Sequence, residues 1–148
     1  MANYAENQKA RFNYEILEKY EGGIELFGYE VKSIRNHRGS LDGAHIIVRG
    51  GEAYLVGAHI PPYQPANTPK NYDPVRTRKI LLTKKEIWEI GGQESKRGLT
   101  IVPLSMYSKG VKIKVSLAVA RGKKKYDKRE TLKKRDTERE MRRALKTE

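Results

Sequence analysis

Residues 98–122 read GLTIVPLSMYSKGVKIKVSLAVARG, and this stretch decides the fold class. It divides into two β-rich runs joined near Lys109-Gly110. Over residues 111–120 of the second run, apolar and other residues alternate strictly. The apolar set comprises Val111, Ile113, Val115, Leu117 and Val119, and the other set comprises Lys112, Lys114, Ser116, Ala118 and Ala120. A period of two is typical of a strand with one face on a core and one in water. We therefore expect a hairpin whose second strand has a wet, basic face.

The remaining segments predict further short strands and one or two helices. Two β-rich runs in residues 43–60 flank Gly50-Gly51, a pair suited to a tight hairpin turn. Residues 12–28 suggest a strand with a bend near Gly22-Gly23, and residues 29–37 fit a short helix or more strand. Thr83 and Glu86 form a capping box, Ile87 and Ile90 form an apolar stripe, and Gly91-Gly92 are expected to end this helix. Five of the six prolines lie in residues 61–74, which predicts an extended surface loop.

These elements indicate a mainly β fold, either a small barrel or a sandwich. A basic strand face and surface aromatics favour the oligonucleotide-binding-like barrel with short flanking helices. We expect one RNA-binding domain over residues 1–120 and a basic tail over residues 121–148. The tail has thirteen Lys or Arg against six Asp or Glu and few apolar residues. It should be disordered alone and fold as a helix from about Asp127, with Glu130 completing a capping box, when an anionic partner neutralises it.

Composition excludes several functional classes. The chain has 31 Lys or Arg, 18 Asp or Glu and no cysteine. A formal charge of +13 favours nucleic acid as partner. The missing cysteines exclude disulfides, zinc ribbons and thiol catalysis, and no apolar run is long enough for a membrane span or a signal peptide, which indicates a cytoplasmic protein. The spacing of the three histidines does not predict a metal site, and no nucleotide-binding glycine motif predicts a cofactor. The carboxylates are scattered and not clustered, so we do not expect an enzyme.

Clustered basic residues follow two elements of the predicted fold. Arg76, Arg78 and Lys79 come after the proline-rich loop, and further basic residues follow the last strand. Cations fixed at the edge of a scaffold can neutralise phosphates and release counterions. We therefore expect Arg76, Arg78 and Lys79 to bind nucleic acid.

Six ordered fragments carry a resemblance to a known family. They are ENQKARFNYEILEKYEGGI, GYEVKSIR, GAHIPPY, YDPVRTRKILL, KRGLTIVPLSMY and LAVARGKKKYDKRETLKKRD. In this order the chain resembles the SsrA-binding protein family of bacterial trans-translation. Phe12 stands where many members have His, and Ile80 where Leu is common. Neither departure touches the tail.

The resemblance implies a non-enzymatic RNA-binding factor for the rescue of stalled ribosomes. Such a factor binds the tRNA-like domain of transfer-messenger RNA and helps deliver it to the ribosomal A site, with elongation factor Tu in the delivery complex. It implies RNA contacts by Asn7, Glu21 and Leu81, although an internal ion pair for Glu21 and a core position for Leu81 remain open. It also implies that the tail occupies the small-subunit decoding centre and the empty mRNA channel. The matching tail residues are Gly122, Lys123, Lys124, Tyr126, Asp127, Lys128 and Arg129.

Two other classes share these features. A ribosomal or RNA-chaperone protein of the same barrel class fits the composition equally well, and only the ordered fragments count against it. An RNA-processing enzyme is the third possibility, which incubation with RNA and Mg²⁺ would test.

Overall fold

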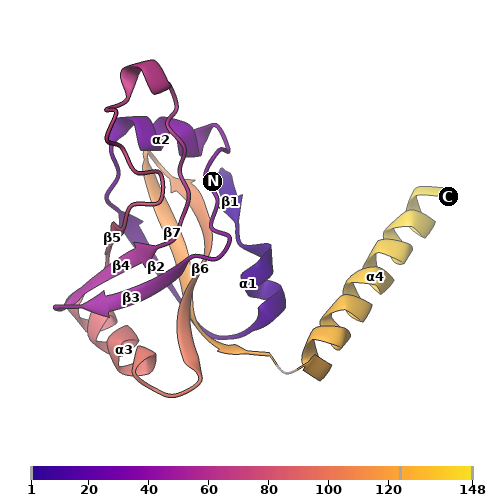
Figure 1. The fold of residues 1–148 in the computed structure, drawn as a ribbon. Helices are drawn as coiled ribbons and strands as arrows, with labels where there is room; N and C mark the ends of the chain where they lie inside the picture. Colours follow the sequence, from indigo (N-terminus) through magenta and orange to yellow (C-terminus); the bar gives the residue numbers. More distant parts are fainter. Residues whose placement is uncertain (1, 124, 148) are drawn as a thin grey trace.

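The computed structural model describes residues 2–123 and 125–147 of the chain (Figure 1). The strands are β1 (Asn3–Glu6), β2 (Tyr14–Ile24), β3 (His45–Arg49), β4 (Glu52–Val56), β5 (Arg78–Leu81), β6 (Leu99–Lys109) and β7 (Lys112–Gly122). The helices are α1 (Gln8–Asn13), α2 (Gly28–Arg35), α3 (Lys84–Glu94) and α4 (Lys125–Thr147), with a short 3-10 turn η1 (Pro65–Asn67). The mainly β composition that the sequence predicts is therefore confirmed.

All strand pairs are antiparallel, and six strands close on one another. The sheet order is β1-β6-β3-β4-β5-β2-β7, and an additional β6–β7 pairing joins its far end back to β6. β1 pairs with β6 from outside this circuit. Closure removes the free sheet edges that invite aggregation. The arrangement is compatible with the expected oligonucleotide-binding-like barrel.

The main core lies inside the circuit and is built from the inward-facing row of each strand. Ile46 on β3 pairs with Ile101 on β6, which pairs with Val119 on β7, and all three are buried. Leu55 on β4 and Ile80 on β5 are fully buried in the same cluster. Paired residues of neighbouring strands point to one face, so the apolar rows meet in the interior.

The outer face of β7 differs from the expectation of a uniformly wet surface. Ala118 and Ala120 are fully buried in a second cluster with Ala10 of α1, because α1 packs on the outside of the β6–β7 hairpin. Only the half with Lys112 and Lys114 stays accessible. Val111, expected in the core, is 86% exposed, since β7 begins after it and the chain turns at Gly110.

Two local expectations, the turn at Gly50-Gly51 and the cap at Thr83, are met, and the position of the irregularity in β2 is corrected. The β3–β4 hairpin turns at Gly50-Gly51, both with positive φ, and Thr83 caps α3 through a capping box with Glu86. The irregularity in β2 lies between Ile16 and Glu18 and not at the glycine pair.

Helix α3 also continues past Gly91-Gly92 to Glu94. Glu94 extends the helix because its carboxylate accepts a hydrogen bond from the Val48 amide at 2.8 Å. The chain then turns at Gly98, whose φ is +82°. Tertiary contacts here override the usual tendency of a glycine pair to end a helix.

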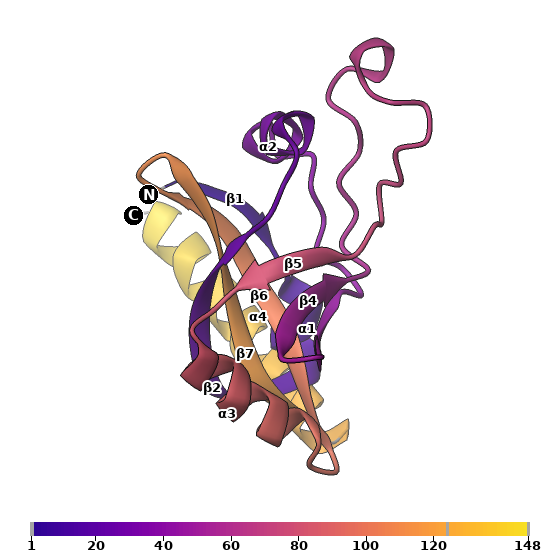
Figure 2. The same ribbon diagram turned by 90° about the vertical axis from the view of Figure 1, so that its left-hand side faces the viewer.

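The segment between β4 and β5 projects from the barrel beside α2, as Figure 2 shows, with η1 within it. Helix α4 lies to the side of the barrel in Figure 1 and follows directly from β7. Within the described ranges, no helix has both the length and the apolar character needed to traverse a bilayer. The described residues also contain no group of three His, Asp or Glu side chains placed to hold a metal ion.

Candidate nucleic-acid interface

One row of residues crosses the outer face of the barrel over four neighbouring strands. Gly23 of β2 pairs with Leu81 of β5 on one side and with Lys114 of β7 on the other. Lys114 in turn pairs with Tyr107 of β6. Leu81 is 48% exposed, so it is not a core residue. The row thus presents an apolar side chain, a cation and a phenol along one surface, with Gly23 buried beneath Leu81.

The two adjacent glycines of β2, Gly22 and Gly23, differ in the space around the position where a side chain would begin. A Cβ on Gly22 would lie 2.8 Å from Ile80 Cγ2 and 2.9 Å from Leu82 Cδ2, so only glycine lets β2 and β5 approach this closely. A Cβ on Gly23 would lie 3.4 Å from Leu81 Cβ, an ordinary contact. Gly22 is therefore required for the close packing of β2 on β5, whereas Gly23 is buried beneath the Leu81 side chain with room for a Cβ.

Glu21 lies in the same surface and is held by two groups from β6. Its carboxylate accepts a hydrogen bond from the Tyr107 hydroxyl and pairs with Lys109 Nζ at 3.0 Å. The Tyr107 and Lys109 hydrogen bonds lower the pKa of Glu21, whereas burial and the neighbouring carboxylate raise the pKa of Tyr107 to about 12. Near neutral pH the site therefore keeps an ionised carboxylate and a protonated phenol in fixed positions. The internal ion pair considered from the sequence is present.

A shallow cleft of about 330 Å³ adjoins this row. Its walls include the apolar side chains of Leu26, Val31 and Leu81 and the two lysines Lys112 and Lys114. Within the described part of the chain, neither lysine has an ion-pair partner. The cleft can thus accept a flat apolar group while presenting two positive charges, of which Lys114 also interacts with the Glu21 carboxylate.

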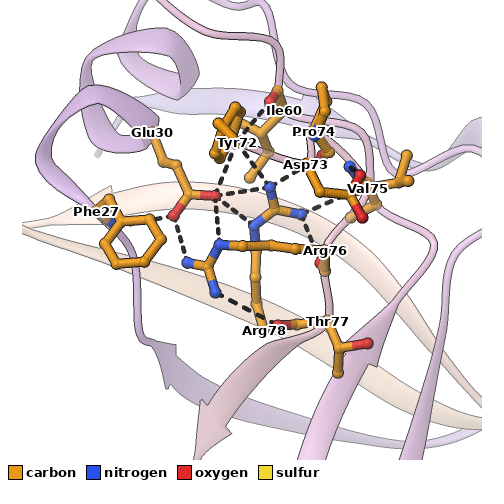
Figure 3. Close-up of polar contacts among 11 residues, drawn as sticks. Phe27, Glu30, Ile60, Tyr72, Asp73, Pro74, Val75, Arg76, Thr77 and Arg78 are labelled. Carbon is orange, nitrogen blue, oxygen red and sulfur yellow. Dashed lines mark hydrogen bonds and ion pairs between the residues drawn. The ribbon is translucent and has the colours of Figure 1, made fainter. Parts of the chain in front are cut away.

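The predicted residues Arg76 and Arg78 meet in a different place, around Glu30 of α2 (Figure 3). The side chains of Glu30 and Arg78 are both 0% exposed. Arg78 Nη2 lies 2.7 Å and Nε 2.8 Å from Glu30 Oε2, and Arg76 Nε lies 3.1 Å from the same oxygen. The Tyr72 hydroxyl lies 2.9 Å from Glu30 Oε2 and accepts a bond from Arg78. We call these four residues the Glu30 clamp.

The clamp fastens the projecting loop to the barrel. Arg78 also donates to the carbonyls of Ala58 and Pro74, each at 3.0 Å, which lie on the two limbs of that loop. Burial alone would raise the pKa of Glu30, but bonds from Arg76, the Phe27 amide and Arg78 outweigh it and lower the pKa. Burial and the Glu30 carboxylate raise the pKa of Tyr72 to about 12. The fully buried Arg78 thus has its counter-charge in Glu30, as a buried ion pair requires, and the excess positive charge lies on Arg76, which is partly exposed.

The clamp corrects the expectation that Arg78 binds nucleic acid. Arg78 is fully buried with its donors occupied, because the alternation of β5 turns it and Ile80 inward. Lys79 and Leu81 face outward, and Lys79 pairs with Glu52 at 3.4 Å. Arg76 retains 26% side-chain exposure, and its guanidinium stacks 4.2 Å from the centre of the Phe27 ring.

Asn7 is also a buried structural residue, 2% exposed. Its side-chain oxygen accepts the Ala10 amide at 3.1 Å and caps α1, while its amide donates to the Pro103 carbonyl at 2.8 Å. These two bonds fasten α1 to β6. A direct contact of Asn7 with RNA, expected from the resemblance, therefore does not fit its position.

Comparison with known proteins places this geometry in a family. The family model described as SmpB protein matches residues 4–147. The chain belongs to the SmpB protein family. The SsrA-binding protein of Gloeothece citriformis is 55% identical, covering 95% of this chain and 91% of that protein. The SsrA-binding protein of Mesoplasma florum is 56% identical, covering 92% of each.

A solved structure of the SmpB family supports the fold. It is described as "tmRNA-SmpB: a journey to the center of the bacterial ribosome". Its chain is 42% identical, with a TM-score of 0.68, and the match covers 86% of this chain and 92% of that chain.

The residues that match the SmpB family tail lie at the junction of β7 and α4. Gly122 is the last residue of β7, and the Lys123 amide donates to the Asn13 carbonyl at 2.8 Å. Arg129 is exposed. Lys124 and the side chains of Tyr126, Asp127 and Lys128 lie outside the described part of the chain.

Helix α4 begins at Lys125, so Asp127 lies in its first turn. A helix that begins at about Asp127 on the ribosome stays a prediction. The helix contacts the body of this SmpB family member where the Arg135 guanidinium stacks 5.3 Å from the centre of the Phe12 ring. Phe12, which stands where many family members have His, thus contacts the tail helix. Disorder of the tail in the free protein stays a prediction.

Sequence reasoning missed the partners of Glu21 in this SmpB family member. Tyr107 and Lys109 lie on β6, 86 and 88 residues away along the chain, and no local pattern links them to β2. The sequence pattern predicts Lys112 and Lys114 only as members of a basic strand face. Their alternation with buried Ile113 and Val115 was the available signal.

Proposed function

We propose that this chain binds the tRNA-like domain of transfer-messenger RNA and acts in the rescue of stalled ribosomes by trans-translation. The observation that carries the proposal is the surface around Glu21, where Leu81, Lys114 and Tyr107 lie in one row across neighbouring strands. The names of the SsrA-binding relatives support the same RNA.

Each group in this surface has a defined role in RNA recognition. Lys112 and Lys114 contact phosphates, and the half-exposed Leu81 side chain accepts the flat face of a base or a ribose. Glu21 accepts hydrogen bonds from 2′-hydroxyl or base amino groups, donors that phosphate lacks. Tyr107 and Lys109 hold this carboxylate ionised and oriented, so an acidic residue is useful in an otherwise basic interface.

The tail takes the second part of the function. Helix α4 enters the small-subunit decoding centre and the empty mRNA channel, in place of the anticodon arm that transfer-messenger RNA lacks. Its exposed basic residues, such as Arg129, are compensated there by ribosomal RNA phosphates. Delivery to the ribosomal A site involves elongation factor Tu in the cytoplasm. The protein acts by binding and positioning and not as an enzyme.

The direct test compares charge-reversal variants by fluorescence anisotropy with the labelled tRNA-like domain. The double variant Lys112→Glu/Lys114→Glu should bind far more weakly than the parent chain, whereas Lys70→Glu, a matched reversal on the projecting loop, should bind normally. With about five phosphate contacts, a plot of log affinity against log salt concentration should have a slope of about −3 to −5 for the parent. The slope for the double variant should be less steep by about 2, because two phosphate contacts are lost. Parent-like binding by the double variant, or a salt slope near zero, would refute the interface.

Selectivity separates this function from that of a general RNA chaperone. The chain should bind the tRNA-like domain much more tightly than ribosomal RNA hairpins of equal length at the same salt concentration. Equal affinities would favour the chaperone class.

A further inference from the structure

Trp88, the single tryptophan of the chain, is 81% exposed on α3. It borders a groove of about 920 Å³ with Tyr20, Val48, Ile87, Gly91 and Gly92. Gly91 packs on Val48, where a Cβ would lie 3.4 Å from Val48 Cγ1, and Gly92 has no atom within 4 Å of a Cβ position. Gly92, one helical turn after Trp88, therefore leaves space on this face of α3 for a flat ring.

Helix α3 and the segment after it carry acidic and basic residues that the rest of the chain contacts differently. The glutamates of α3 each have a partner within the chain. Glu86 forms the capping box with Thr83, and Glu89 accepts a hydrogen bond from the Tyr20 hydroxyl at 3.2 Å. Glu94 forms an ion pair with Arg49 at 2.9 Å. Glu18, at the groove wall, also interacts with the Tyr20 hydroxyl.

The basic residues of the same region are in the opposite situation. Lys84, Lys85, Lys96 and Arg97 are exposed, and none has an ion pair or a side-chain hydrogen bond within the described residues. Lys84 and Lys96 line the groove together with Trp88. The groove thus combines an exposed aromatic ring with two lysines that form no ion pair within the described residues. Its two carboxylates, Glu18 and Glu89, are held by the Tyr20 hydroxyl, so the exposed lysines favour a partner with anionic groups.

We propose that α3 is a second RNA-contacting surface, in which Trp88 stacks on an unpaired base while Lys84 and Lys96 contact the phosphates on either side. This inference rests on the proposed function as an RNA-binding protein and adds a site to it. An exposed indole beside free lysines matches the two features of single-stranded nucleic acid, a ring with a π-face and a flanking phosphate. An acidic peptide would satisfy the lysines but leave the indole without a ring to stack on.

The position of α3 makes this surface separate from the first. In Figures 1 and 2, α3 lies at the lower end of the barrel, whereas α2, whose residue Val31 lines the cleft beside Leu81, lies at the upper end. Along β2 and the β5–α3 connection the two surfaces nevertheless adjoin, because Tyr20 precedes Glu21 and Lys84 follows Leu81 by three residues, so one RNA can contact both through different nucleotides. The unpaired nucleotide comes either from transfer-messenger RNA or from ribosomal RNA, which share this chemistry.

The test uses Trp88 itself as the reporter, because the full-length chain has no other tryptophan. Titration with hexaadenylate should quench the indole fluorescence, and the quench should weaken as salt rises. With fluorescein-labelled hexaadenylate, anisotropy should show a loss of about 5- to 100-fold in affinity for Trp88→Ala and much less for Trp88→Phe, which keeps a ring. Val75→Ala, which truncates another exposed apolar side chain away from α3, should bind as the parent does.

The source of the base is found by repeating the Trp88→Ala measurement with whole transfer-messenger RNA and with purified ribosomes. A loss with the first alone assigns the base to transfer-messenger RNA, and a loss with ribosomes alone assigns it to ribosomal RNA. No quench by hexaadenylate together with parent-like binding of both particles by Trp88→Ala overturns the inference, including the case in which a protein occupies the groove. The Lys112→Glu/Lys114→Glu variant tests the first surface independently, so the two proposals fail separately.

Discussion

The buried charge cluster around Glu30 allows a stability prediction of defined size. Glu30→Gln removes one negative charge and leaves the guanidiniums of Arg76 and Arg78 facing a neutral amide. Arg78 and residue 30 are both 0% exposed, so water cannot replace the lost carboxylate without opening the structure. Breaking one side of a buried ion pair costs about 3–5 kcal/mol. The amide nitrogen of glutamine adds a donor where the arginines already supply donors, which opposes any recovery.

Urea unfolding followed by circular dichroism measures this cost. The free energy of unfolding should fall by about 3–5 kcal/mol for Glu30→Gln, which corresponds to about 10–15 °C in Tm for a chain of this size. The matched control is Glu52→Gln, which removes a carboxylate from the exposed pair with Lys79 and should change the free energy by about 0–1 kcal/mol. If the two variants lose the same amount, the clamp does not stabilise the fold as argued.

The pH dependence checks the same argument by another route. Folding lowers the pKa of Glu30, so its ionisation stabilises the native state above the ordinary carboxyl pKa, and this contribution is lost as pH falls through the lowered pKa. The parent chain should therefore lose stability below about pH 4.5, and Glu30→Gln should lack this component. Parallel pH profiles for the parent and the variant would show that Glu30 is not the titrating group.

Three further predictions concern packing and the tail. Gly22→Ala should destabilise the fold by about 1–3 kcal/mol in urea unfolding because its Cβ would overlap Ile80 and Leu82, whereas Gly92→Ala, in a helix with open space, should stabilise it by about 0.5–1 kcal/mol. Deleting residues 121–148 should leave binding of the tRNA-like domain largely intact and abolish peptide tagging on stalled ribosomes; normal tagging would show that the tail is dispensable. Tyr126→Ala should impair tagging far more than Tyr126→Phe, because stacking needs a ring and not a hydroxyl, and equal activities would leave Tyr126 without a role.

The antiparallel strands were predictable because their patterns are local. The strict alternation of residues 112–117, the Gly50-Gly51 turn and the Thr83 cap each act within a few residues, and the structure contains all three. The end of α3 was not predictable in this way. It depends on a hydrogen bond between Glu94 and the Val48 amide, which only the folded barrel brings together.

The outer half of β7 shows the same limit for a face of a sheet. Alternation correctly separates its two faces, but it does not tell which face a helix will cover. Ala118 and Ala120 are small residues that permit α1 to approach, and their size, unlike the charge of Lys112 and Lys114, was the available signal. Alanine on a supposedly wet face is therefore an indication of a second packing layer.

The segment RTRKILL at residues 76–82 shows why basic residues near a binding site need to be interpreted by strand position as well as composition. Within β5, Arg78 and Ile80 face inward, and Lys79 and Leu81 face outward. The inward pair stabilises the fold, because Arg78 forms a buried ion pair with Glu30 and Ile80 packs in the core. The outward pair lies on the surface, where a ligand can reach it. The buried partner of Arg78 sits 48 residues away on α2, in a stretch whose single acid gives no local sign of its role. A one-residue shift in register would exchange the two pairs and would bury Lys79 without a counter-ion, so the clamp also fixes the register that keeps Leu81 on the outer face.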